Sequence, residues 1–320
     1  MTAKTPKANV FCLMGATASG KTALAVELSK RLPVEIISVD SAQIYRDMDI
    51  GTGKLDADTL ALAPHALIDI RDPVESYSAA EFRSDALAEI KRIQQANKIP
   101  LLVGGTMLYF RVLRDGLTEL PGANIEIRAQ IEAMAKEQGW QAVHARLAQV
   151  DAQSAQRIHK NDPQRLSRAL EVFMLTGKSM TQLHSEANAA KSAANAQLPF
   201  NLHYMAIQVA DRASLHTKIA SRFHGMLDAG LVAEVQALSR RGDLSESMPS
   251  MKSVGYRQVW QFLRDELSYK DMVERGIIAT RQLAKRQTTW LRSWPDLTCL
   301  SDLPEKSMDE ILKYIETTPT

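Results

Sequence analysis

The chain has 320 residues, roughly the length of two domains, and its 45% hydrophobic and 24% charged residues are average for globular proteins. Thirty-nine Lys and Arg against thirty-seven Asp and Glu give a formal charge of +2, which excludes a uniformly basic protein. Cys12 and Cys299 form neither a disulfide framework nor a zinc site, and no apolar run is long enough to span a bilayer. We expect a soluble protein of a reducing, cytoplasmic compartment.

Short apolar runs alternate with helical stretches in the first third of the chain. Strand-like runs occupy 9–14, 34–40, 65–70 and 99–105, and helical periodicity occupies 23–32 and 78–98. Continuous apolar strands that alternate with helices are typical of a parallel sheet covered on both faces. This pattern predicts a doubly wound α/β unit.

The pattern changes after residue 117. Residues 124–186 show only helical periodicity, with Asp162 and Pro163 placed as the cap and first residue of a helix. The small, polar stretch 188–197 is expected to be an exposed loop, and strand character returns at 200–209. Residues 211–294 are mostly helical, and a weak strand at 297–300 and a last helix follow. We therefore expect a P-loop α/β core of residues 1–117 and 199–320, with an all-helical insertion domain of residues 118–198.

A phosphate-binding loop follows the first strand. Its motif, G-x-x-x-x-G-K-[ST], is filled by Gly15, Ala16, Thr17, Ala18, Ser19, Gly20, Lys21 and Thr22. The glycines let several backbone N–H groups point at phosphate oxygens, and the following helix adds the positive end of its dipole. Lys21 supplies a charge and the Thr22 hydroxyl can ligate Mg²⁺. The motif predicts a ligand with at least a diphosphate, without deciding between ATP, GTP and another compound.

A polar segment, Asp40-Ser-Ala-Gln-Ile-Tyr45, ends the second strand beside this loop. Asp40 can act as a general base and its neighbours can bind an amide or amino edge. From spacing alone, a helix-capping or Mg²⁺-binding Asp is at least as plausible. Asp40 and Asp69, which follows Ala66-Leu-Ile68, also loosely fit the acid that ends an apolar strand in ATPases. No N-K-x-D guanine motif is present.

Eight segments in order resemble the tRNA dimethylallyltransferase (tRNA isopentenyltransferase) family of the bacterial type. They are GATASGKT, DSAQIYRDMDIGTGK, YSAAEF, LLVGGTMLYF, DPQRLSRALEV, SRFHGML, VGYRQVW and AKRQTTWLR, spread between residues 10 and 294. The resemblance implies transfer of a dimethylallyl group from dimethylallyl diphosphate to N6 of the adenosine 3′ of the anticodon in tRNA, with release of diphosphate. It also implies Mg²⁺ as cofactor and a monomeric protein.

The resemblance also implies roles for single residues. Asp40 matches the general base, while Lys21 and Arg222 match groups that hold the diphosphate. From the residues alone, Arg222 reads more readily as a solvated helix residue, with His216, Ile219, Phe223 and Met226 forming the buried face of its helix. The implied tRNA contacts are Asp40, Ser41, Ala42, Gln43, Thr106, Arg128, Gln164, Arg165, Leu166, Ser167, Arg168, Lys252, Ser253, Val254, Gly255, Tyr256, Arg257, Lys285, Arg286, Gln287, Thr288, Thr289, Trp290, Leu291 and Arg292.

Alternatives to several of these roles remain open. Thr106 can cap the helix that follows it, and the stripe Arg281, Lys285, Thr289 and Arg292 can be an ordinary solvated face. Two departures from the family pattern, Ala16 for proline and GTGK for GTAK, remove no chemically active group. A small-molecule or nucleoside kinase that binds ATP in the loop is the main alternative function, and an RNA-binding module with a vestigial loop is a third.

The small net charge hides an uneven distribution. Residues 250–292 hold nine Lys and Arg against four Asp and Glu, whereas the last twenty-eight residues hold two against six. The basic region coincides with segments that the resemblance assigns to RNA. A tRNA ligand is therefore compatible with the composition.

Overall fold

The computed structural model describes residues 7–118, 120–194 and 198–319, which form two compact units. The first unit combines the chain up to Gly116 with the chain from Leu198 onward, and the second spans Leu117–Gln197. Within the described residues, no helix is long and apolar enough to cross a membrane.

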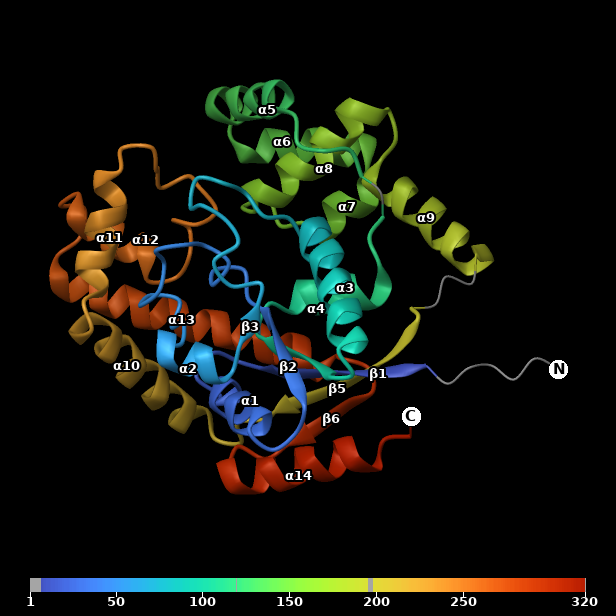
Figure 1. Ribbon diagram of the computed structural model, residues 1–320. Coiled ribbons are helices and arrows are strands. Elements are labelled where there is room, and N and C mark those ends of the chain that lie inside the picture. Colours follow the sequence, from blue (N-terminus) through green and yellow to red (C-terminus); the bar gives the residue numbers. More distant parts are fainter. Residues whose placement is uncertain (1–6, 119, 195–197, 320) are drawn as a thin grey trace. The chain divides into compact units, whose positions relative to one another are not determined.

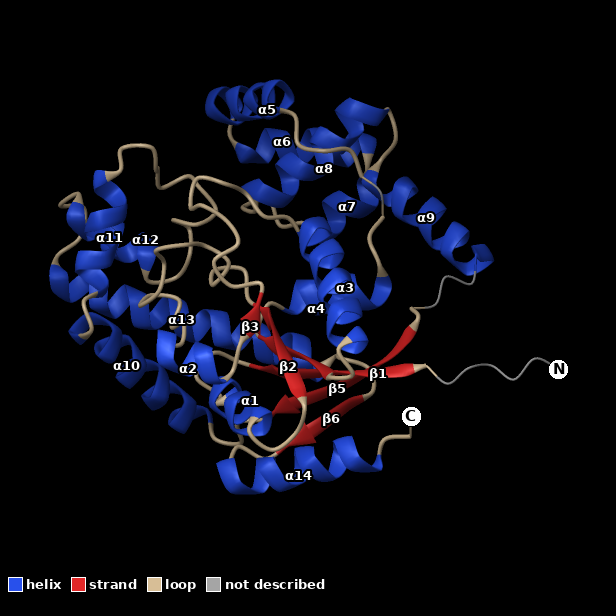
Figure 2. Ribbon diagram, viewed as in Figure 1, coloured by secondary structure: helices blue, strands red, loops and turns tan. Residues whose placement is uncertain are grey.

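The first unit is built on a six-stranded parallel sheet, as the alternating pattern predicts (Figure 2). The strand order is β3-β2-β4-β1-β5-β6. The strands are β1 (Ala8–Gly15), β2 (Val34–Val39), β3 (His65–Ala66), β4 (Ile99–Gly104), β5 (Phe200–Ile207) and β6 (Leu297–Leu300). Because all strands are parallel, their carboxyl ends share one edge, where ligands bind in open α/β sheets.

The register places three loops together at that edge. Met14 lies opposite Gly104 across β1 and β4, and Val39 lies opposite Gly104 across β2 and β4. The chain segments that follow β1, β2 and β4 therefore begin side by side. These segments are the phosphate loop, the Asp40 segment and the Gly105–Thr106 turn.

Helices cover both faces of the sheet (Figure 1). On one face α1 (Lys21–Ser29) and α14 (Pro304–Thr317) pack against alternate strand residues such as Phe11 and Leu13. On the other face α3 (Ala79–Gln95) and α4 (Met107–Asp115) pack against Val10 and Cys12. This two-sided burial explains why the strands read as continuous apolar runs.

Four helices of the carboxyl-terminal half form a further core around the segment that follows β2. They are α10 (Arg212–Asp228), α11 (Leu231–Arg240), α12 (Tyr256–Leu263) and α13 (Tyr269–Arg292). Their shared core contains the fully buried Tyr256 and Met48. The segment after Asp40 is thus held by helices that lie about 200 residues later in the sequence.

The second unit consists of helices throughout its described part. These are α5 (Ile125–Gln138), α6 (Trp140–Val150), α7 (Ala152–Arg157), α8 (Pro163–Thr176) and α9 (Met180–Ala194). The Asp162 carboxylate accepts a hydrogen bond from the Arg165 N–H, so α8 begins as predicted. The loop expected at 188–197 is wrong for residues 188–194, which belong to α9, and residues 195–197 lie outside the described part. Alanine's high helix propensity explains the difference, because it needs no apolar periodicity.

The third apolar run forms a much shorter strand than expected. β3 (His65–Ala66) pairs only with Ile36 and Ile37, and the chain then turns through Leu67 and Asp69, both with positive φ. Asp69 N–H donates instead to the Gln43 carbonyl, 3.2 Å away. The run therefore braces the Asp40 segment rather than extending the sheet. A short helix, α2 (Ala57–Leu62), lies in the chain between the Asp40 segment and β3.

Candidate active site

The phosphate loop offers unpaired donors at the start of α1. Gly20, at φ 90°, turns the chain into the helix that begins at Lys21. The N–H groups of the first helical turn have no partner within the helix. The Ser19 hydroxyl is buried and has no hydrogen-bond partner among the described residues. Desolvation lowers the Lys21 pKa to about 8, with Asp40 opposing the shift and Arg222 adding to it. The loop is suited to bind an anion.

Asp40 follows β2 and faces this loop. Its Oδ1 accepts hydrogen bonds from the N–H groups of Ala42, at 2.8 Å, and Gln43, at 3.3 Å. Within the described ranges no hydrogen bond to its Oδ2 is found. One carboxylate oxygen thus fixes the turn and the other remains available for chemistry.

Arg222 reaches the same place from α10. Its Nη2 donates to the Thr52 carbonyl at 3.4 Å, and a Cβ added at Gly53 would overlap that Nη2 atom. Desolvation lowers the Arg222 pKa, while the negative charge of Asp40 opposes the shift. The glycine of the GTGK segment therefore makes room for this guanidinium.

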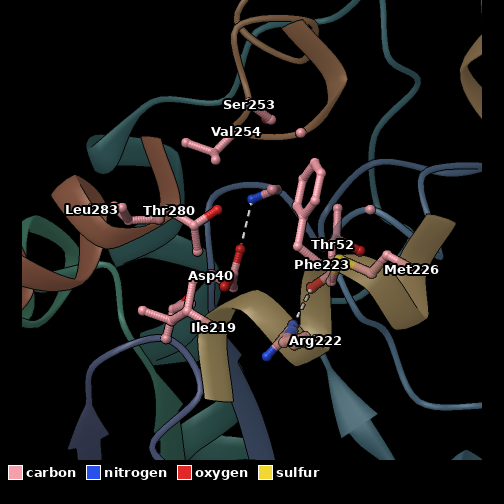
Figure 3. A pocket seen from close by; sticks show the side chains of 14 residues that line it. Asp40, Thr52, Ile219, Arg222, Phe223, Met226, Ser253, Val254, Thr280 and Leu283 are labelled. Atoms are coloured by element: carbon pink, nitrogen blue, oxygen red, sulfur yellow. Dashed lines mark hydrogen bonds between the residues drawn. The ribbon is translucent and has the colours of Figure 1, made fainter. Parts of the chain in front are cut away.

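A small cavity of about 100 Å³ joins these groups (Figure 3). Thr17, Asp40, Thr52 and Arg222 contribute polar atoms to it. Its apolar lining comes from Ile219, Phe223 and Met226 of α10, Leu283 of α13, and Val254 in the turn before α12. Thr17 of the phosphate loop, the Asp40 carboxylate, the Arg222 guanidinium and an apolar wall therefore share one cavity.

Thr106 is joined to the Asp40 segment. Its Oγ1 accepts from the Ser41 N–H at 3.1 Å and donates to the Ser41 Oγ at 3.4 Å. The side chain makes no hydrogen bond to the helix that it precedes. Thr106 is therefore the N-cap residue of α4, as the alternative held, but its hydroxyl bonds Ser41 and does not cap the helix.

Internal hydrogen bonds stabilise the remaining polar residues of this segment. Gln43 Oε1 accepts from the Ser38 hydroxyl at 3.1 Å, and Gln43 Nε2 donates to the Thr52 and Gly53 carbonyls at 3.4 Å. Asp69 pairs with Lys54, whose ammonium also contacts Asp49 at 2.7 Å. Asp69 is therefore paired with Lys54, whereas Asp40 is the acid that lines the cavity.

The comparisons with known proteins identify the family. The family model described as IPP transferase matches residues 43–294, more than half of the chain. The chain belongs to the IPP transferase family. The full-length tRNA isopentenylpyrophosphate transferase of Bacillus halodurans is 33% identical with a TM-score of 0.70, over 97% of this chain and 96% of that one. The tRNA Δ(2)-isopentenylpyrophosphate transferase of Staphylococcus epidermidis is 32% identical with a TM-score of 0.68, over 98% and 100%.

A third solved structure agrees in fold. A eukaryotic dimethylallyltransferase that acts on tRNA is 23% identical with a TM-score of 0.77, over 98% of this chain and 80% of that one. Membership of the IPP transferase family makes the chain a prenyltransferase, and it does not favour the kinase alternative.

The expected tRNA contacts of this IPP transferase fall into three groups by exposure. Exposed residues are Ser41, Arg128, Gln164, Arg165, Lys252, Arg257, Lys285, Arg286, Thr289 and Arg292. Partly buried residues are Asp40, Ala42, Gln43, Thr106, Ser167, Arg168, Ser253, Val254, Thr288 and Trp290. Buried residues are Leu166, Gly255, Tyr256, Gln287 and Leu291. In this structure the buried side chains pack against protein, so contact with tRNA remains a prediction for the accessible residues.

Two arginines of the helical unit that are expected to contact tRNA donate hydrogen bonds to one buried carboxylate. Glu171 is fully buried and accepts from Arg128 Nε at 2.9 Å and Arg168 Nη1 at 2.8 Å. The Asn124 N–H donates to the same carboxylate at 2.8 Å. Burial raises the Glu171 pKa, but these charged hydrogen bonds outweigh it and the pKa lies below its usual value. Glu171 thus fixes the positions of two arginines.

Sequence reasoning missed Thr52, Thr280 and Leu283, which also line the cavity. Thr280, Leu283 and Gln287 are spaced three and then four residues apart on α13, so they share the inner face of that helix. That spacing was a usable signal. Thr52 gave none, because it reaches the cavity only through the long segment after Asp40.

Proposed function

We propose that this IPP transferase transfers a dimethylallyl group from dimethylallyl diphosphate to N6 of the adenosine 3′ of the anticodon in tRNA. The observation that carries the proposal is the cavity in which Asp40, Arg222 and Thr17 of the phosphate loop meet an apolar wall. The anion site accepts the diphosphate, the wall accepts the five-carbon chain, and the carboxylate faces the reacting atoms. The relatives at 32 and 33% identity are tRNA isopentenylpyrophosphate transferases, which supports transfer of a five-carbon prenyl group to tRNA.

The diphosphate is the leaving group. As the bond between the allylic carbon and the diphosphate oxygen breaks, negative charge grows on the phosphates. The first-turn N–H groups of α1, the Lys21 ammonium and the Arg222 guanidinium are in place to stabilise that charge. Fixed donors of this kind favour the transition state over the bound substrate.

Mg²⁺ fits this site as an ion carried by the substrate. Among the described residues no group of three or more His, Cys, Asp or Glu side chains could hold a metal. Thr22, in the first turn of α1, would contribute its hydroxyl, and diphosphate oxygens and water would complete the coordination. When bound, the ion supplies positive charge to the diphosphate.

Asp40 acts as the general base. The adenine amino group is a weak nucleophile, so its attack on the allylic carbon requires positioning and loss of a proton. The free Oδ2 of Asp40 accepts that proton, while Oδ1 remains bonded to the Ala42 and Gln43 N–H groups. To reach the cavity, the adenosine leaves the anticodon-loop stack. We further propose that the enzyme works as a monomer in the cytoplasm.

A transfer assay tests this function. The purified protein is incubated with Mg²⁺, unmodified tRNA and dimethylallyl diphosphate labelled in the allyl group. We expect label in the RNA and one diphosphate released for each group transferred. A parallel reaction with ATP and nucleoside acceptors should show no turnover. Absence of label in the RNA, or phosphoryl transfer from ATP, would contradict the proposal.

A further inference from the structure

Gln287 lies on the inner face of α13 and connects that helix to the phosphate loop. Its side-chain Oε1 accepts from the Thr17 N–H at 2.8 Å, and its Nε2 donates to the Gly105 carbonyl at 2.9 Å. Gln287 is only 8% exposed. One buried amide therefore joins the segments that follow β1 and β4, at Thr17 and Gly105, which are 88 residues apart.

Gly105 lies close to the amide of Gln287. A Cβ added at Gly105 would overlap Gln287 Nε2 and lie 3.2 Å from the Gly15 carbonyl oxygen. The missing side chain at Gly105 is what allows the amide to approach both segments. Leaving the buried amide without these partners would be unfavourable, because a buried polar group loses its hydrogen bonds to water.

Because of the hydrogen bond to Thr17, the N–H groups of the phosphate loop fall into two sets, one bonded to protein and one free for a ligand. The Thr17 N–H is satisfied by protein, whereas the first-turn N–H groups of α1 have no helical partner and remain for an anion. Holding the start of the loop fixes the direction of these free donors. On the outer face of α13, Lys285, Arg286 and Thr289 are exposed.

We propose that Gln287 is a positioning residue for the diphosphate loop and not a tRNA contact. The KRQTTWLR segment then has two faces, the outer for RNA and the inner for the loop that holds the leaving group. This inference rests on the proposed function, because it takes diphosphate as the ligand of the loop.

The test is the variant Gln287→Met, which keeps the length of the side chain and removes both hydrogen bonds. Binding of inorganic diphosphate with Mg²⁺ is measured by calorimetry, and tRNA binding is measured separately. We expect the Kd for diphosphate and the KM for dimethylallyl diphosphate to rise about tenfold, the effect of losing one or two buried hydrogen bonds. The Kd for tRNA should stay within about twofold.

Lys285→Met, two residues earlier on the outer face, is the matched control and should weaken tRNA binding while diphosphate binding is unchanged. Gly105→Ala, which removes the same contact from the opposite side, should reproduce the Gln287→Met pattern. Because both substitutions remove the same contact, the double variant Gln287→Met/Gly105→Ala should bind diphosphate no more weakly than the weaker-binding of the two single variants. If Gln287→Met does not fold, Gly105→Ala decides by the same criteria.

Three results would overturn the inference: weaker tRNA binding with unchanged diphosphate binding, no change in either, or an equal loss of both. Failure of the wild-type protein to bind diphosphate at all would contradict the proposed function instead. The two failures are therefore distinguishable.

Discussion

At the residue scale, Asp40 uses its two carboxylate oxygens differently. An Asn in its place can still accept the Ala42 and Gln43 N–H groups through Oδ1, so the turn is preserved. The amide cannot accept the proton of the adenine amino group. We therefore expect Asp40→Asn to lower the rate of transfer by about 100-fold or more, with tRNA binding largely retained.

Single-turnover transfer and filter binding of tRNA measure the two effects. Asp228→Asn, an exposed position at the end of α10, is the matched carboxylate control and should leave both unchanged. An equal loss of binding and rate in Asp40→Asn would instead assign the residue a structural role.

The Lys21 ammonium predicts a pH dependence. Its pKa of about 8 in the free protein is lowered chiefly by desolvation. Diphosphate favours the protonated lysine, so kcat/KM for dimethylallyl diphosphate should be constant below that pKa and fall by up to about tenfold per pH unit above it. In Lys21→Arg the charge persists, and the decline above pH 8 should disappear. A decline that remains unchanged in this variant would contradict the assignment.

The sequence predicts single residues best where their partners are close along the chain. The phosphate loop is contiguous from Gly15 to Thr22, so its chemistry can be recognised from the motif. Gln287 acts on Thr17 across 270 positions, and only the folded chain brings them together. A motif match placed Gln287 among RNA contacts because it cannot distinguish the two faces of a helix.

At the scale of elements, Glu234 of α11 holds the segment that lines the cavity. Its carboxylate accepts the N–H groups of Asp49 at 2.9 Å, Ile50 at 2.7 Å and Gly51 at 3.1 Å, and the Tyr256 hydroxyl at 2.5 Å. In Glu234→Gln an NH₂ group would face donors. We expect a loss of about 2 kcal/mol in the free energy of unfolding, measured by urea denaturation.

Tyr256→Phe removes only one of these bonds and should cost about 1 kcal/mol. Glu274→Gln, exposed on α13, is the matched control and should be neutral. A neutral Glu234→Gln would show that the segment after Asp40 is held by its apolar contacts alone.

Elements were predictable where one physical rule dominated. Buried parallel strands such as β1 and β4 appear as unbroken apolar runs, because both of their faces are covered. The run at 65–70 has the same composition, but Leu67 and Asp69 adopt positive φ to brace the Asp40 segment. That conformation is set by a tertiary contact with Gln43 and leaves no mark in the local sequence.

At the scale of the whole molecule, the even balance of charge conceals a basic region. Lys285 and Arg286 are exposed on α13, whereas the last twenty-eight residues are acidic. Each phosphate contact releases counterions, so Lys285→Met should reduce the slope of log Kd for tRNA against log salt by about one. Lys306→Met, which removes an exposed lysine of α14, should leave the slope unchanged. Equal slopes for both variants and the wild type would exclude the outer face of α13 from the RNA interface.

We propose that the cavity at Asp40 joins a dimethylallyl group to one adenosine of tRNA. Nucleoside mass spectrometry of tRNA treated with the purified protein and dimethylallyl diphosphate tests it most directly. We predict one adenosine heavier by a dimethylallyl group at N6, located 3′ of the anticodon, and no product when guanosine replaces it. Unmodified tRNA, or a prenyl group on another nucleoside, would rule out this function for the cavity.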